Sequence, residues 1–170
     1  SAPPMALPAS ADSAAPATSA EGGVRILEEK TITGSSSGYV AWPSLALLPD
    51  GELVIVASGG RLGHACPFGK GYLYRSRDLG KTWTGPETIT DGALDDRGFS
   101  LLATSRGTLL AGGFSSITWL HYLGGGKPDF DRGKLEEQAN RGTLGAFREE
   151  IGFWQLRSVD GGKSWGRQRA

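Results

Sequence analysis

The chain has 170 residues, 27 of them glycine, and equal numbers of basic and acidic side chains, 18 of each. A formal net charge of zero argues against nucleic acid or an anionic membrane as a partner held mainly by charge. The single cysteine excludes an intrachain disulfide, and no apolar run is long enough for a membrane-spanning helix. The length suits one domain with a sizeable core, and the glycine content predicts many tight turns.

Residues 1–23 precede the first apolar pattern and are rich in Ala, Pro and Ser. The first 20 residues contain 16 of these three types and no Lys or Arg. This composition predicts a disordered linker. The segment is not itself a signal peptide, because the charged start and the apolar centre of one are both missing. We interpret it as the stretch left after a signal is removed, which predicts a secreted or periplasmic protein.

Two segments of the chain repeat the same order of strands and turns. The stretch 43–56 aligns with 99–112, and each reads as an apolar strand, a polar turn ending in Gly51 or Gly107, and a second apolar strand. Further along, "YLYRSRDLGKTW" aligns with "WQLRSVDGGKSW". The second copy carries 26 extra residues, roughly 118–150, because the two alignments are offset by 56 and 82 residues. Each copy predicts four short antiparallel strands, the pattern of a β-propeller blade.

An eight-residue turn, Ser-x-Asp-x-Gly-x-Thr/Ser-Trp, lies near the end of each copy. Its aspartate can accept hydrogen bonds from backbone amides of the same turn, and its glycine can adopt a positive φ. Its tryptophan can bury a large ring between neighbouring strands. The predicted structural residues are Ser76, Asp78, Gly80 and Trp83 in the first copy and Ser158, Asp160, Gly162 and Trp165 in the second.

These turns resemble the Asp boxes of the sialidase (neuraminidase) superfamily, and the resemblance covers about residues 37–170. It implies an all-β, six-bladed propeller of which this chain holds about two blades, 37–90 and 97–170. Residues 24–170 would then be the N-terminal part of the propeller, and the remaining blades would come from a missing C-terminal part. Asp boxes indicate the fold rather than the activity, because they also occur in other glycosidases, lyases and sorting receptors.

The loop 59–71, the connection 91–98 and the insertion share one face of the predicted propeller, which is the substrate face in sialidases. Arg61 matches the arginine of a Gly-Arg or Asn-Arg pair in that family. We expect it to bind a sugar carboxylate through two parallel hydrogen bonds, or else to bond the carbonyls of its own loop. His64 belongs to a His-x-Cys-Pro-Phe-Gly stretch that is similar to one in environmental sialidase-like proteins, which implies a place in the site.

Asp95, Asp96 and Arg97 precede the first strand of the second copy. Side chains alternate along an extended segment, so Asp95 and Arg97 should share a side while Asp96 points away. One aspartate is a candidate acid and the other a partner for an arginine, with a salt-bridged junction between blades as the alternative. The predicted catalytic residues are therefore Asp96, Asp95 and His64, and the predicted substrate-binding residues are Arg61, Arg97, Trp119 and His121.

The sequence departs from the sialidase pattern in two places. Ala41, Trp42 and Pro43 stand where sialidases begin with Arg-Ile-Pro, so the first carboxylate-binding arginine is missing. The loop 62–70 contains no carboxylate to match the family's acid. Two histidines and one cysteine are too few for a zinc site, and we predict neither metal nor cofactor.

The leading hypothesis is a sialidase-like glycoside hydrolase that cleaves terminal sialic acid or a related acidic sugar from a glycan. A different glycosidase, or a lyase of uronate polysaccharides, is the alternative enzyme. A carbohydrate-binding propeller without catalysis is the alternative outside enzymes. We predict a glycan partner, no nucleic acid and no membrane span.

Overall fold

The computed structural model describes residues 25–34, 38–119 and 148–169. The chain divides into two units, residues 1–31 and 32–170. In the first unit, the described residues 25–31 are exposed and have no regular secondary structure. Two predictions fall outside the described residues: the linker, 1–23, and the substrate-binding residue His121.

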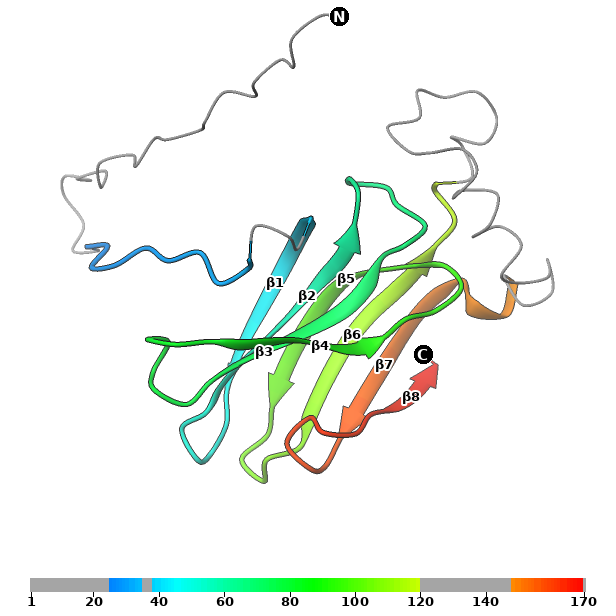
Figure 1. The fold of residues 1–170 in the computed structure, drawn as a ribbon. Coiled ribbons are helices and arrows are strands. Elements are labelled where there is room, and N and C mark those ends of the chain that lie inside the picture. Colours follow the sequence, from blue (N-terminus) through cyan, green and yellow to red (C-terminus); the bar gives the residue numbers. More distant parts are fainter. Residues whose placement is uncertain (1–24, 35–37, 120–147, 170) are drawn as a thin grey trace, which may run out of the picture. The chain divides into compact units, whose positions relative to one another are not determined.

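The second unit contains two four-stranded antiparallel sheets (Figure 1), with strand orders β1-β2-β3-β4 and β5-β6-β7-β8. This confirms the predicted all-β class and the predicted order of strands. The strands are β1 (Tyr39–Leu47), β2 (Leu53–Arg61), β3 (Lys70–Ser76), β4 (Thr84–Thr90), β5 (Asp95–Ala103), β6 (Leu109–Ser116), β7 (Gly152–Ser158) and β8 (Gly166–Arg169). Within the described residues, no helix is long and apolar enough to cross a membrane.

The first hairpin of each sheet turns in the same way. In the β1–β2 turn, the amide of Leu48 donates to the carbonyl of Glu52 at 2.9 Å. In the β5–β6 turn, the amide of Thr104 donates to the carbonyl of Thr108 at 2.9 Å. Gly51 and Gly107 have φ of 88° and 79°, a conformation that favours glycine. The repeat seen in the sequence is therefore a repeat of backbone geometry.

The two eight-residue turns, 76–83 and 158–165, are called here the repeated turns. In the first, Asp78 accepts from the Ser76 hydroxyl and from the Thr82 amide, both at 2.8 Å. In the second, Asp160 accepts from the Ser158 hydroxyl at 2.7 Å and from the Ser164 amide at 3.0 Å. The predicted role of both aspartates is confirmed.

The glycine and tryptophan of each repeated turn also match between the copies. Gly80 and Gly162 have φ of 87° and 85°. The indole N–H of Trp83 donates to the Gly80 carbonyl, and that of Trp165 to the Gly162 carbonyl, each at 3.0 Å. Trp83 is half-buried, whereas Trp165 packs against the hydrophobic core. The same hydrogen bonds thus close both turns, but the second ring is tied more closely to the core.

The hydrophobic core lies between the two sheets and takes side chains from both. Phe99 on β5 and Trp154 on β7 meet at a ring-centroid distance of 5.4 Å, edge to face. The amide of Leu101 on β5 donates to the Ser44 hydroxyl on β1 at 2.9 Å, which joins the sheets directly. The buried cluster comprises Leu48, Val54, Val56, Leu73, Phe99, Leu109, Ala111, Trp154 and Leu156.

The opposite faces of the two sheets leave large apolar side chains exposed. On the first sheet, Leu45 and Leu47 are 57% and 60% exposed. On the second sheet, Leu102 and Phe153 are 59% and 74% exposed. Alternate residues of a strand point to opposite faces, so each sheet has one apolar face in the core and a second one that is open.

Candidate functional site

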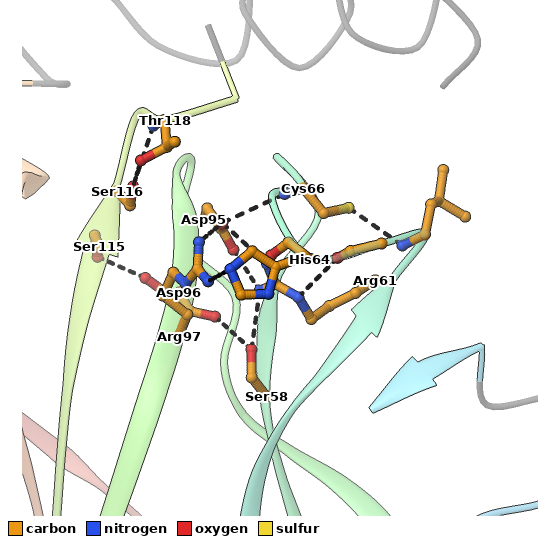
Figure 2. Close-up of polar contacts among 12 residues, drawn as sticks. Ser58, Arg61, His64, Cys66, Asp95, Asp96, Arg97, Ser115, Ser116 and Thr118 are labelled. Atoms are coloured by element: carbon orange, nitrogen blue, oxygen red, sulfur yellow. Dashed lines mark hydrogen bonds and ion pairs between the residues drawn. The ribbon is translucent and has the colours of Figure 1, made fainter. Parts of the chain in front are cut away.

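A cluster of charged and aromatic side chains lies at the end of the sheets opposite the repeated turns. It comprises Tyr39, Trp42, Arg61, His64, Asp95 and Arg97 and is called here the arginine cluster. Arg61 is the last residue of β2, and Asp95 and Arg97 lie at the start of β5. The Ser58 hydroxyl of β2 donates to the Asp96 carbonyl of β5 at 3.0 Å, which holds the two segments together at this end. Figure 2 shows His64 of the intervening loop beside Arg97.

Arg61 is fully buried and uses all five of its N–H donors within the chain. Its two terminal nitrogens donate to the two carboxylate oxygens of Asp95 at 2.5 and 3.0 Å. They also donate to the Ser58 hydroxyl at 3.0 Å and to the His64 carbonyl at 2.5 Å. The Nε group donates to the Gly63 carbonyl at 3.3 Å. These bonds fix the loop after β2 to the start of β5.

This geometry bears on the predicted role of Arg61 as a ligand of a sugar carboxylate. The fork that would bind a substrate already binds Asp95, and the exposed fraction of both side chains is 0%. Gly69 lies so close that a Cβ atom there would overlap both members of the pair. Substrate binding by Arg61 stays a prediction, while the structure shows an arginine that bonds the carbonyls of its loop.

Arg97 is held differently, because several of its N–H groups are not used in hydrogen bonds with described residues. One terminal nitrogen lies 3.5 Å from Asp95 Oδ2, and the other lies 3.2 Å from His64 Nε2. The guanidinium carbon lies 4.6 Å from the centre of the Trp42 ring and 5.8 Å from that of Phe114. Three of its five N–H donors have no partner among the described residues. Burial lowers the pKa of Arg97, and Asp95 opposes that shift.

The contact between Arg97 and His64 defines which ring nitrogen accepts when the two are hydrogen-bonded. A guanidinium has donors only, so His64 Nε2 accepts in this contact and the ring proton sits on Nδ1. His64 is exposed, and its ring meets Trp42 edge to face at 5.2 Å. An exposed imidazole therefore lies next to a cation that retains free donors.

The two aspartates point to opposite sides of β5, as the alternation of an extended segment predicts. Asp95 faces Arg61 and Arg97, and burial raises its pKa while these cations oppose the shift. Asp96 points away from these cations, and its oxygens accept from the Ser115 hydroxyl of β6 at 2.6 Å and from the Thr90 hydroxyl of β4 at 2.8 Å. Both carboxylates are 0% exposed. Their catalytic roles stay predictions, and the structure shows them as buried hydrogen-bond acceptors.

Sequence reasoning assigned neither Tyr39 nor Trp42 to the site, and of the two it is Trp42 whose ring contacts both arginines. It has φ of 53°, which is unusual for a large side chain, and lies where the β1–β2 register shifts. This backbone places its ring within 5.1 Å of the Arg61 guanidinium as well as against Arg97. The departure from Arg-Ile-Pro at residues 41–43 was the sequence signal that could have indicated it.

Two other candidates lie outside the cluster or deep within the protein. Trp119, predicted to stack on a sugar, is fully buried. Cys66 is buried, and its Sγ accepts from the Leu62 amide at 3.3 Å. Among the described residues, no group of three or more His, Cys, Asp or Glu side chains could hold a metal ion.

Comparisons with known proteins identify a similar fold but no family. No family model and no curated protein matches the chain. The solved structure of a protein of unknown function from Dyadobacter fermentans DSM 18053 is similar, with 25% identity and a TM-score of 0.58. The match covers 84% of this chain and 39% of that one, so this chain spans well under half the length of its structural neighbour.

Proposed function

We propose that the arginine cluster binds the carboxylate of an acidic sugar, and that the chain is the substrate-recognising part of a sialidase-like glycoside hydrolase. The observation that carries this proposal is the pairing of Arg97 with His64. Arg97 keeps three N–H donors free beside an exposed imidazole and the Trp42 ring. A guanidinium with free donors is the side chain best suited to bind a planar carboxylate.

Each neighbour of Arg97 has a part in this proposal. Trp42 lies against the guanidinium and limits the directions in which its donors point. The buried Arg61–Asp95 pair holds the loop that carries His64, because Arg61 donates to the His64 carbonyl. His64 presents a ring N–H to a hydroxyl or carboxylate of the sugar, since its other nitrogen accepts from Arg97.

Cleavage by a glycoside hydrolase requires two carboxyl groups that reach the glycosidic bond. Asp95 and Asp96 are enclosed by donors of this chain, so we assign them positioning roles. The residues that cleave the bond would then come from other parts of the protein.

A lyase of uronate polysaccharides is the second candidate, favoured by the same pair of residues. Removal of a proton next to a uronate carboxylate needs a neutral base beside a cation that stabilises the developing charge. Arg97 supplies the cation, and His64 supplies the base once a substrate carboxylate takes the Arg97 donor that Nε2 accepts at 3.2 Å. The hydrolase and the lyase thus share the ligand class and differ in the product.

We also infer that the two sheets are consecutive blades of a larger propeller of the sialidase type. Three observations support this: the two sheets carry the same turns, both outer faces are apolar and exposed, and the similar solved structure is longer. Further sheets would cover Leu45, Leu47, Leu102 and Phe153. A secreted or periplasmic location fits a protein that acts on glycans, and it stays a proposal.

The test compares binding and product formation by the intact protein, Arg97→Lys and the exposed control Arg157→Lys. Calorimetry with sialyllactose and with trigalacturonate measures binding, and chromatography detects free sialic acid or an unsaturated uronate. We expect Arg97→Lys to weaken binding about tenfold, because the lysine ammonium is a point charge and cannot form the two parallel hydrogen bonds of a guanidinium.

The products decide between the activities. Free sialic acid supports the hydrolase, an unsaturated uronate supports the lyase, and binding without a product supports a carbohydrate-binding protein. Absence of binding to both sugars, or equal binding by Arg97→Lys and Arg157→Lys, would overturn the recognition of carboxylates by this cluster.

A further inference from the structure

A second polar cavity lies at the end of the sheets that carries the repeated turns, away from the arginine cluster. It has a volume of about 600 Å³ and is called here the turn-end cleft. The residues that matter for its charge are Glu52, Arg75, Arg77, Glu87, Asp160 and Lys163. A smaller cavity of about 380 Å³ shares Leu48, Asp50 and Gly161 with it and adds Arg106. The two cavities adjoin at these shared residues and are together called here the groove.

The glutamates of the cleft are already bound to arginines. Glu52 is 7% exposed, and its two oxygens accept from Arg75 at 3.2 Å and from Arg77 at 3.0 Å. Glu87 accepts from Arg75 Nε at 3.1 Å.

The two aspartates bind donors of their own turns. Asp160 Oδ2 accepts from the Ser164 hydroxyl at 2.5 Å, and Asp50 accepts from the Glu52 amide at 3.1 Å. Hydrogen bonds also lower the pKa of Asp160, so this carboxylate is ionised and satisfied within its turn. A cation entering the cleft would have to displace these donors.

The cationic groups, in contrast, are left with unused donors. The Arg77 side chain is 82% exposed and spends only its Nε group on Glu52. Lys163 and Arg106 form no ion pair with any other described residue. Below them, Arg75 Nη2 is buried and has no hydrogen-bond partner in the described part of the chain. Arg77, Lys163 and Arg106 therefore keep free donors on positive groups, and among the carboxylates only Asp50 and Glu87 keep an oxygen without a hydrogen bond from the described residues.

From these free cationic donors we propose that the turn-end cleft binds the oxyanions of an acidic oligosaccharide, as carboxylates or sulfate esters. Arg77 and Lys163 bind one anionic group in the larger cavity, and Arg106 binds a second group further along the groove. Charge-assisted hydrogen bonds from these donors need no rearrangement of the ion pairs around Glu52. The cleft is separate from the arginine cluster, so this inference does not depend on the proposed function.

The test is a calorimetric titration of the intact protein at low salt with three probes. A heparin-derived tetrasaccharide offers sulfate esters, trigalacturonate offers carboxylates, and maltotetraose carries no charge. The variant Arg77→Gln/Lys163→Gln removes two charges from the cleft. Its matched control, Arg148→Gln/Arg157→Gln, removes two charges from exposed positions that do not line the cleft.

We expect saturable binding of at least one charged probe and none of the neutral one. The cleft variant should weaken that binding about tenfold, while the control and Arg97→Lys change it less than about twofold. The probe that binds more tightly identifies the anionic group. If both double variants weaken binding equally, the effect depends on the net charge of the protein alone, and the proposed site is overturned. Absence of saturable binding, or loss only in Arg97→Lys, would overturn it as well.

Discussion

The guanidinium of Arg61 and the carboxylate of Asp95 form a bidentate ion pair from which water is fully excluded, with 0% of either side chain exposed. The pair joins the end of β2 to the start of β5, and through the Gly63 and His64 carbonyls it also anchors the loop between β2 and β3. Breaking it therefore affects stability and the position of His64 together.

We expect Arg61→Ala to lower the free energy of unfolding by about 3–5 kcal/mol, because Asp95 is then buried without its main partner. Urea denaturation followed by circular dichroism measures this change. Arg157→Ala, at an exposed position, should change the free energy of unfolding by less than about 0.5 kcal/mol. A similar midpoint for wild type and Arg61→Ala would contradict the structural role of the pair.

Gly69→Ala should destabilise the protein through the same ion pair. The added methyl group would overlap Asp95 and Arg61, neither of which has room to move, so a loss of about 1–3 kcal/mol or more is expected. Gly166→Ala is the matched control, since the nearest atom to a Cβ there, the Arg157 carbonyl oxygen, is 3.8 Å away. Equal melting temperatures for the two variants would show that the packing around Gly69 is looser than described.

The two tryptophans of the repeated turns should differ in their contribution to stability. Both rings are half-buried, but Trp165 also packs against the core, so Trp165→Ala should cost about 2–3 kcal/mol, somewhat less than truncation of a fully buried ring. Trp83 is half-buried, and Trp83→Ala should cost distinctly less. Chemical denaturation of both variants under the same conditions makes the comparison, and a larger loss at Trp83 would contradict it.

Acid should weaken the repeated turns before it affects the core. Hydrogen bonds from Thr82 lower the pKa of Asp78 to about 2, and those from Ser164 lower the pKa of Asp160. A carboxyl whose pKa is lower in the folded state stabilises the fold above its unfolded value, roughly pH 4, and loses that contribution as the pH falls toward 2.

Unfolding midpoints measured between pH 5 and 2 test this expectation. The slope against pH should be smaller in Asp78→Asn/Asp160→Asn, because asparagine accepts hydrogen bonds but does not titrate. Glu28→Gln/Glu29→Gln, at exposed positions, should keep the slope of the wild type. If the unfolding midpoint of the aspartate variant depends on pH as steeply as that of the wild type, Asp78 and Asp160 are not the groups that make the fold acid-sensitive.

The elements that could be predicted from the sequence are those whose structure depends on near neighbours. The repeated turns have their hydrogen bonds within eight residues, so the positions of Asp78 and Asp160 were enough to predict them. The alternation along β5 likewise predicted that Asp95 and Asp96 point to opposite sides. Local periodicity also located the strands of both sheets.

The candidate site could be predicted only in part, because its chemistry depends on contacts between distant segments. The loop around His64 and the start of β5 were expected at one end of the fold, and they do meet there. Asp95 accepts from both terminal nitrogens of Arg61. This contact joins residues 34 positions apart, and no spacing in the sequence indicates it. Trp42 was missed because its place depends on a positive φ at a shift in strand register.

The hydrogen bonds of each repeated turn lie within the turn, so the turn does not depend on the length of the loops elsewhere in its sheet. Each turn satisfies its polar groups without help from the other sheet, so a copied gene segment brings a complete hairpin closure with it. The second copy has gained 26 residues before β7, and its turn still forms the same bonds as the first. A change of length in the loops opposite the turns therefore leaves these hydrogen bonds unaltered.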